Sequence, residues 1–221
     1  MFIRKYKSLM LILFFTLLIS LQLVDAKMNS ILPLEGKIIT IDPGHGGRDS
    51  GTISGKLMEK DLNLEISYQL KKVLEENGAT VYMTRMVDED LSSKWDARKK
   101  RGDLYRRILF IQNKKSDLYL SIHINAGNGR GQEVLYHSIN KNNLLLAESI
   151  HNEFKKEFKT KRIIKKTNLY LYSNTRVPGV LIECGFLSNP NDRYLLQKED
   201  YQKRLALSIT RGVYEYFQKE L

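Results

Sequence analysis

Two histidines and two glutamates stand where their side chains can share one chemical task. His45 follows an apolar, β-branched run, His123 ends a second such run, Glu183 ends a third, and Glu59 stands where a helical pattern begins. Because the carboxyl ends of strands in an open α/β sheet meet in one crevice, we expect the four side chains to converge there. Two imidazoles and one carboxylate suit Zn²⁺ with one position left for water, and a second carboxylate can accept that water's proton.

Each of these residues also fits an ordinary structural role. The donors are scattered along the chain rather than packed as in a His-Glu-x-x-His motif, so their spacing alone does not decide between a metal site and ordinary structural roles. His45 also fits a turn histidine among glycines, His123 a histidine bonded to a backbone carbonyl, and Glu59 an exposed charge at a helix mouth. Glu183 fits less easily, because it follows the apolar run 180–182, where an unpaired carboxylate is costly.

Alternating strand and helix patterns are expected to position these residues. Strands are predicted at 36–42, 79–84, 117–123, 132–137, 169–172 and 179–184. A first helix is predicted to begin at Asp61, which would cap it, and further helices are predicted over 96–114, 144–158 and 201–217. The basic residues of 96–114 and Ser149 of 144–158 are predicted to face outward. The fold class is therefore α/β: a single domain with a mostly parallel, twisted sheet flanked by helices on both faces, and the zinc site at the carboxyl ends of the strands.

The N-terminus has the pattern of an export signal. Three basic residues precede an apolar run over 9–23, and small residues then lead to Ala26, where a signal peptidase could cut unless the run stays as an anchor. We therefore expect a signal peptide or N-terminal anchor at 1–26, a tether at 27–35 and a catalytic domain at 36–221. The protein would be exported, touching the membrane only through its N-terminal segment.

Composition narrows the classes of partner. The formal net charge is +11, which favours anionic envelopes. We expect no nucleic acid partner, because the sequence has no zinc-finger spacing and no interleaving of aromatic and basic residues on a strand. Cys184 is the only cysteine, so no disulfide framework is possible, and strand alternation turns its side chain away from Glu183 into the core.

Four blocks of sequence carry a family resemblance. In chain order they are 42–47 (DPGHGG), 59–64 (EKDLNL), 121–126 (SIHINA) and 183–189 (ECGFLSN). Together they resemble the signature blocks of zinc N-acetylmuramoyl-L-alanine amidases of the amidase-3 type. The resemblance implies one Zn²⁺ per chain, held by His45, Glu59 and His123, with Glu183 as the catalytic acid/base. The implied substrate bond joins the lactyl group of N-acetylmuramic acid to L-alanine in peptidoglycan.

Within that family the chain resembles the small, germination-specific amidases of the spore cortex, whose cut prepares muramic-δ-lactam formation. The implied location is outside the cytoplasmic membrane, in the cell wall or the intermembrane space of a developing spore. Glycan strands with stem peptides would be the partner, and Asn125 and Arg130 are candidate substrate contacts in the loop after His123. Two other functions stay open: a peptidoglycan-binding module without activity, and a zinc peptidase or deacetylase acting on another wall bond.

The stretch 85–114 bears on whether access to the crevice is controlled. It holds only a polar loop, with Trp95 as its one large aromatic residue, and a basic helix, which leaves little chain for a helix that plugs the crevice. We therefore expect an open crevice. Since no wall-binding repeat is present in this sequence and bare charge gives little spatial precision, we expect an envelope protein partner to localise or activate the enzyme.

Overall fold

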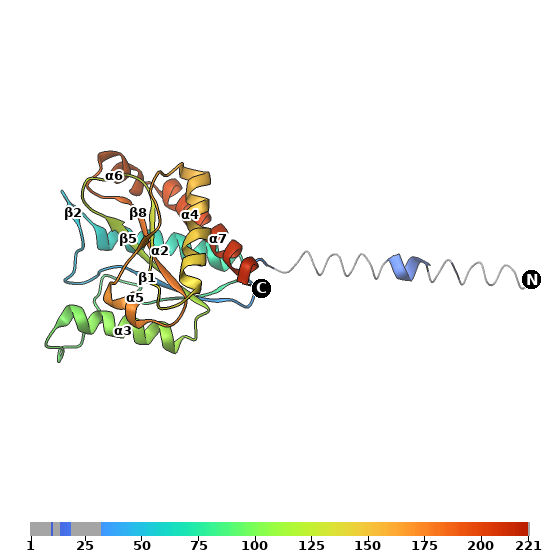
Figure 1. Ribbon diagram of the computed structural model, residues 1–221, viewed down its shortest axis with the longest axis horizontal. Helices are drawn as coiled ribbons and strands as arrows, with labels where there is room; N and C mark the ends of the chain where they lie inside the picture. The colour runs from blue at the N-terminus through green and yellow to red at the C-terminus, as the bar shows by residue number, and fades with distance from the viewer. Residues whose placement is uncertain (1–9, 11–13, 19–31, 221) are drawn as a thin grey trace, which may run out of the picture.

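The protein is seen here as a computed structural model that describes residues 10, 14–18 and 32–220 (Figure 1). Its elements are β1 (Ile38–Pro43), β2 (Ile53–Ser54), β3 (Leu57–Met58), α2 (Glu59–Glu76), β4 (Thr80–Met83), α3 (Lys99–Asn113), β5 (Leu118–Asn125), β6 (Glu133–Tyr136), α4 (Asn142–Phe158), β7 (Lys165–Lys166), α5 (Tyr170–Asn174), β8 (Gly179–Phe186), α6 (Pro190–Leu196) and α7 (Glu199–Glu220). None of the described helices has both the length and the apolar character of a membrane span.

Six strands form one sheet in the order β4-β1-β5-β8-β6-β7. The first four are parallel to one another, and β6 joins β8 antiparallel, with β7 parallel to β6 at the edge. The central strands β1, β5 and β8 are almost wholly buried, as expected for parallel strands that are covered on both faces. The predicted α/β domain with a mostly parallel sheet is confirmed.

Helices cover both faces of the sheet. Helices α2, α4 and α7 pack over the larger core cluster, while α3 and α5 cover a smaller cluster that includes Tyr119 and Leu181 (Figure 1). Strand alternation divides the residues of β1 between these faces: Ile39 and Ile41 enter the larger core, and Asp42 turns toward α3. The face of the sheet beneath α3 and α5 therefore carries the polar side chains that a functional site needs.

Three details of the sequence prediction are wrong. Residues 169–172, predicted as a strand from their apolar alternation, fall largely within the short helix α5. Asp61 does not cap α2, because that helix begins at Glu59, its N-cap residue is Met58, and no side chain makes a cap hydrogen bond. Ser149 and Arg107, both predicted to face outward, are 1% and 2% exposed.

The predicted export segment at 1–26 lies almost entirely outside the described residues, so it stays a prediction. The described end of the predicted tether, residues 32–35, packs against the domain. Leu34 is 1% exposed, and its backbone N–H donates to the carbonyl of Asn77 at 2.8 Å. This contact joins the start of the domain to the end of α2.

Candidate active site

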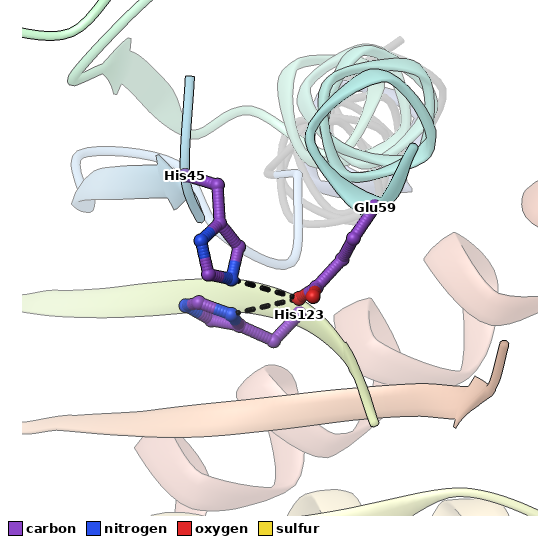
Figure 2. Close-up of side chains that lie close together, drawn as sticks. All are labelled: His45, Glu59 and His123. Atoms are coloured by element: carbon purple, nitrogen blue, oxygen red, sulfur yellow. Dashed lines mark hydrogen bonds and ion pairs between the residues drawn. The ribbon is translucent and has the colours of Figure 1, made fainter. Parts of the chain in front are cut away.

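The three predicted metal ligands meet at one point. His45 lies in the loop after β1, His123 on β5 and Glu59 at the first turn of α2 (Figure 2). Glu59 Oε1 lies 3.1 Å from His45 Nε2 and 3.1 Å from His123 Nδ1. One donor atom from each residue lies within 4.8 Å of the others, so this group could hold a metal ion. Two imidazole nitrogens and a carboxylate oxygen are the donor set of hydrolytic zinc sites.

Local charge keeps Glu59 ionised. Burial by itself would raise the pKa of Glu59, but hydrogen bonds and charge from His123 and His45 outweigh it and hold that pKa well below the usual range. Backbone N–H groups of Thr52 and Ile124 donate to its two oxygens at 2.9 and 3.1 Å. An anionic carboxylate with fixed orientation is what a cation needs from this position.

Asp49 orients the ring of His45. Its carboxylate lies 3.0 Å from His45 Nδ1, on the side of the ring away from Glu59. Burial would lower the pKa of His45, yet the bonds to Glu59 and Asp49 raise it. A carboxylate on the outer nitrogen fixes which tautomer a metal-binding histidine adopts and how its ring lies. Asp49 was not singled out from the sequence, although it stands four residues after His45.

Two glycines give the ligands their space. A Cβ at position 44 would lie 2.2–2.6 Å from ring atoms of His123, and one at position 51 would lie 2.5 Å from Glu59 Oε2 and 2.7 Å from His45 Cδ2. Gly51 also has φ +63°, a left-handed conformation that glycine adopts without strain. The sequence block around His45 therefore needs small residues for packing as well as for its turn.

Arg107 holds the loop that carries His45. This side chain is 2% exposed, and it donates to Asp42 Oδ1 at 2.8 Å, Asp103 Oδ2 at 2.8 Å, the Pro43 carbonyl at 2.8 Å and the His45 carbonyl at 2.6 Å. His45 itself has φ 60°, which is uncommon for a residue with a side chain. The guanidinium thus fastens a strained backbone from α3.

A second arginine and a buried carboxylate complete this support. Arg85 donates to the carbonyls of Pro43 and Gly44 at 3.0 and 2.9 Å. Burial would raise the pKa of Asp42, but the charge of Arg107 and hydrogen bonds from neighbouring hydroxyls hold it below the usual value. The carbonyls of three consecutive residues are therefore bound by two fixed guanidinium groups.

Glu183 lies on β8 beside the candidate metal ligands. It is the register partner of His123 on β5, and on its other side it is the partner of Glu133 on β6. Burial, together with the charges of Glu59 and Glu133, raises the pKa of Glu183 to about 8. Its Oε2 atom is buried and has no hydrogen-bond partner among the described residues. A carboxyl with a free oxygen and a raised pKa can exchange protons near neutral pH.

Comparisons with known proteins identify the family. Residues 39–215 match the amidase-3 family, described as N-acetylmuramoyl-L-alanine amidase. The chain belongs to this family. A germination-specific N-acetylmuramoyl-L-alanine amidase of Bacillus subtilis is 39% identical over 97% of this chain and 96% of its own.

Solved structures of the amidase family share the fold. The CwlD amidase from Clostridioides difficile, in complex with the GerS lipoprotein, has a TM-score of 0.78 at 32% identity, covering 83% of this chain and 100% of its own. The catalytic domain of CwlV, an amidase from Bacillus (Paenibacillus) polymyxa var. colistinus, has a TM-score of 0.71 at 30% identity, covering 82% and 98%.

A crevice of about 710 Å³ is lined by the three candidate metal ligands and Glu183. One wall is formed by Leu104 of α3 and by Tyr170 and Leu171 of α5. Asn125 lines the crevice and donates to Glu133 at 3.3 Å, as suits a residue at its rim. Arg130 does not line it: its side chain is 68% exposed and 3.9 Å from Asp192. The substrate contacts predicted for Asn125 and Arg130 both stay predictions.

Cys184 and Trp95 lie apart from the crevice. Cys184 is fully buried, as predicted. Trp95 is 81% exposed in the loop before α3 and is absent from the crevice lining, and the lining includes no residue of 86–98. The described part of that loop therefore does not close the crevice.

Proposed function

We propose that this amidase-family enzyme hydrolyses the amide between N-acetylmuramic acid and the L-alanine of the peptidoglycan stem peptide. The observation that carries the proposal is the convergence of His45, Glu59 and His123 with Glu183 in a single crevice, within a chain matched to the family over 39–215. A module that only bound wall glycan would not need this donor set beside a protonatable carboxyl.

The crevice residues have two tasks, which are to hold the metal and to transfer a proton. His45 through Nε2, His123 through Nδ1 and Glu59 through a carboxylate oxygen would hold one Zn²⁺ per chain. A Zn²⁺ ion held there would supply Lewis acidity, which would polarise the scissile carbonyl and lower the pKa of a nearby water toward about 7. Glu183 accepts the proton of the attacking water and delivers it to the departing amine of L-alanine.

The wider setting follows from the relatives. We infer that the chain acts in germination on spore cortex, preparing muramic-δ-lactam formation, because the Bacillus subtilis relative is a germination-specific amidase. We infer an exported protein with a signal peptide or anchor at 1–26. We also propose an envelope lipoprotein as partner, since the Clostridioides difficile amidase was solved with one.

Muropeptide analysis tests the function. Purified protein should release peptides with free L-alanine amino termini from cortex peptidoglycan, and a chelator should stop the release. Replacing Glu183 by Gln should lower turnover on the order of a hundredfold or more while zinc content stays at about one per chain. Products cut at another peptide or acetyl bond would instead assign a peptidase or deacetylase, and binding without products would assign a binding module.

Zinc content tests the ligands. Elemental analysis of His45→Ala and His123→Ala proteins should find the metal lost, whereas His137→Ala, at a partly exposed histidine outside the crevice lining, should retain it. Unchanged zinc in either of the first two variants would remove that histidine from the ligand set.

A further inference from the structure

A cluster of cations lies at the edge of the sheet beyond the crevice. Residues 159–166 read KTKRIIKK, so five of eight residues are basic and none is acidic. They join α4 to the edge strand β7. We call Lys159, Lys161, Arg162 and Lys165 the basic edge; the first two and Lys165 are exposed, and Arg162 is partly exposed.

The basic edge is continuous with the active site. His123, Glu183 and Glu133 are register partners on β5, β8 and β6, so they form a row across the sheet. Glu133 is 1% exposed because Arg162 Nη2 and Lys165 Nζ cover it, at 2.8 and 2.7 Å from its Oε1. The row that begins at a metal ligand thus ends under two cations.

The remaining charges are available to a ligand. Within the described part of the chain, Lys159 and Lys161 form no ion pair, while Arg162 and Lys165 are partly neutralised by Glu133. The loop is fastened at its start, where the Thr160 hydroxyl donates to the Gln132 carbonyl at 2.9 Å. Its two free ammonium groups therefore stand on an anchored loop rather than on a free tail.

The spacing suits the substrate. Neighbouring strands lie about 4.8 Å apart, so three steps from β5 to β7 span roughly 14 Å. A stem peptide of about four residues covers roughly 14 Å when extended. Stem peptides carry free carboxylates beyond their first residue, whereas the scissile amide is at their start. A stem with that amide at the metal site would therefore bring its far carboxylates to the basic edge.

We propose that the basic edge is a subsite for the carboxylates of the stem peptide. The inference rests on the proposed function and adds to it the recognition of the peptide's acidic end. A lipid surface fits less well: the segment is not helical, and Ile163, 67% exposed, is one of only two apolar residues in it. Membrane-surface segments need a broad apolar face beside their cations.

Steady-state kinetics test the proposal on two soluble substrates: a muramoyl tetrapeptide, and the same molecule with its peptide carboxylates converted to amides. The variant carries Lys159→Asn and Lys161→Gln; asparagine tolerates the left-handed backbone at 159, where φ is 55°. On the acid substrate KM should rise roughly fivefold with kcat unchanged, as expected for losing two exposed charge contacts. On the amidated substrate wild type and variant should agree, and the difference on the acid substrate should shrink in high salt.

The matched control carries Lys72→Gln and Lys203→Gln. These exposed lysines lie on α2 and α7, which cover the opposite face, and the charge change is the same. An equal rise in KM for the control, or none for the first variant, would overturn the proposal. So would loss of binding to phosphatidylglycerol vesicles with KM unaltered, which would assign the edge to membrane lipid. Absence of cleavage by the wild type on both substrates would instead refute the proposed function.

Discussion

Replacing Arg107 by Lys tests whether a buried guanidinium is needed to form the metal site. A lysine keeps the positive charge near Asp42, but its single ammonium cannot reach two carboxylates and two carbonyls in different directions. Pro43 retains a donor in Arg85, whereas the carbonyl of His45 loses the 2.6 Å bond from Arg107. The backbone of His45, with φ 60°, is then no longer fastened.

The expected magnitudes follow from that one lost bond. The carbonyl of His45 is partly buried, so losing its donor should cost up to the roughly 1–3 kcal/mol of a buried group. In a domain of this size each kcal/mol lowers Tm by about 2–4 °C, so metal-free Arg107→Lys protein should melt roughly 2–12 °C below wild type. Zinc affinity should fall about 10- to 100-fold, the usual effect of removing a group that orients a metal ligand.

Two measurements on purified protein separate the outcomes: thermal unfolding without metal, and zinc titration against a coloured chelator. Arg106→Lys is the control, because that arginine lies on the same helix and is more exposed. Wild-type zinc affinity in a destabilised Arg107→Lys protein would refute the positioning role and leave Arg107 a purely structural residue. An unchanged Tm would refute the hydrogen bonding described above.

Three further outcomes are expected. Gly44→Ala should fold yet lose zinc, because its methyl group would lie within 2.6 Å of the His123 ring; elemental analysis and circular dichroism check this. In the folded, metal-free protein the pKa of Glu183 is about 8, whereas in the unfolded chain it is near 4.5. The protonated side chain therefore stabilises the fold fully below about pH 4.5, and this stabilisation is lost as the pH rises to about 8. Urea unfolding of Glu183→Gln should therefore lack that decline, and equal pH profiles for the two proteins would contradict it. Glu59→Gln should lose zinc binding by titration, because the amide supplies no charge to the cation.

The sequence allowed much of the site to be predicted because its residues stand at the ends of apolar runs. Such runs predict strands, and parallel strands bring their ends together. Arg107 was missed since it lies in a helix rich in exposed basic residues. A signal was nevertheless present: Leu104, Ile108 and Ile111 define an apolar stripe, and Arg107 falls on it.

Other errors arose where local pattern and tertiary packing disagree. The alternation at 169–172 is typical of a strand, but Leu171 and Tyr172 are both buried, in a helical turn that packs with α3. The strand β7 was not predicted, because it consists of two exposed lysines and has no apolar pattern. It lies at the edge of the sheet and pairs only with β6. Glu133 gave no sign of its place beside Glu183, which depends on the antiparallel register of β6.

The position of β8 has a consequence for the order of folding. Strands β5 and β6 follow one another in sequence, yet β8, made last of the six, separates them. A chain synthesised only as far as β7 lacks the centre of its sheet, and with it Glu183. Such long-range pairing slows folding. A fragment ending at Pro178 should accordingly show no cooperative thermal transition, and a sharp one would show that the other five strands of this sheet fold without β8. Until β8 is made, the nascent chain would therefore remain incompletely folded and without hydrolytic capacity.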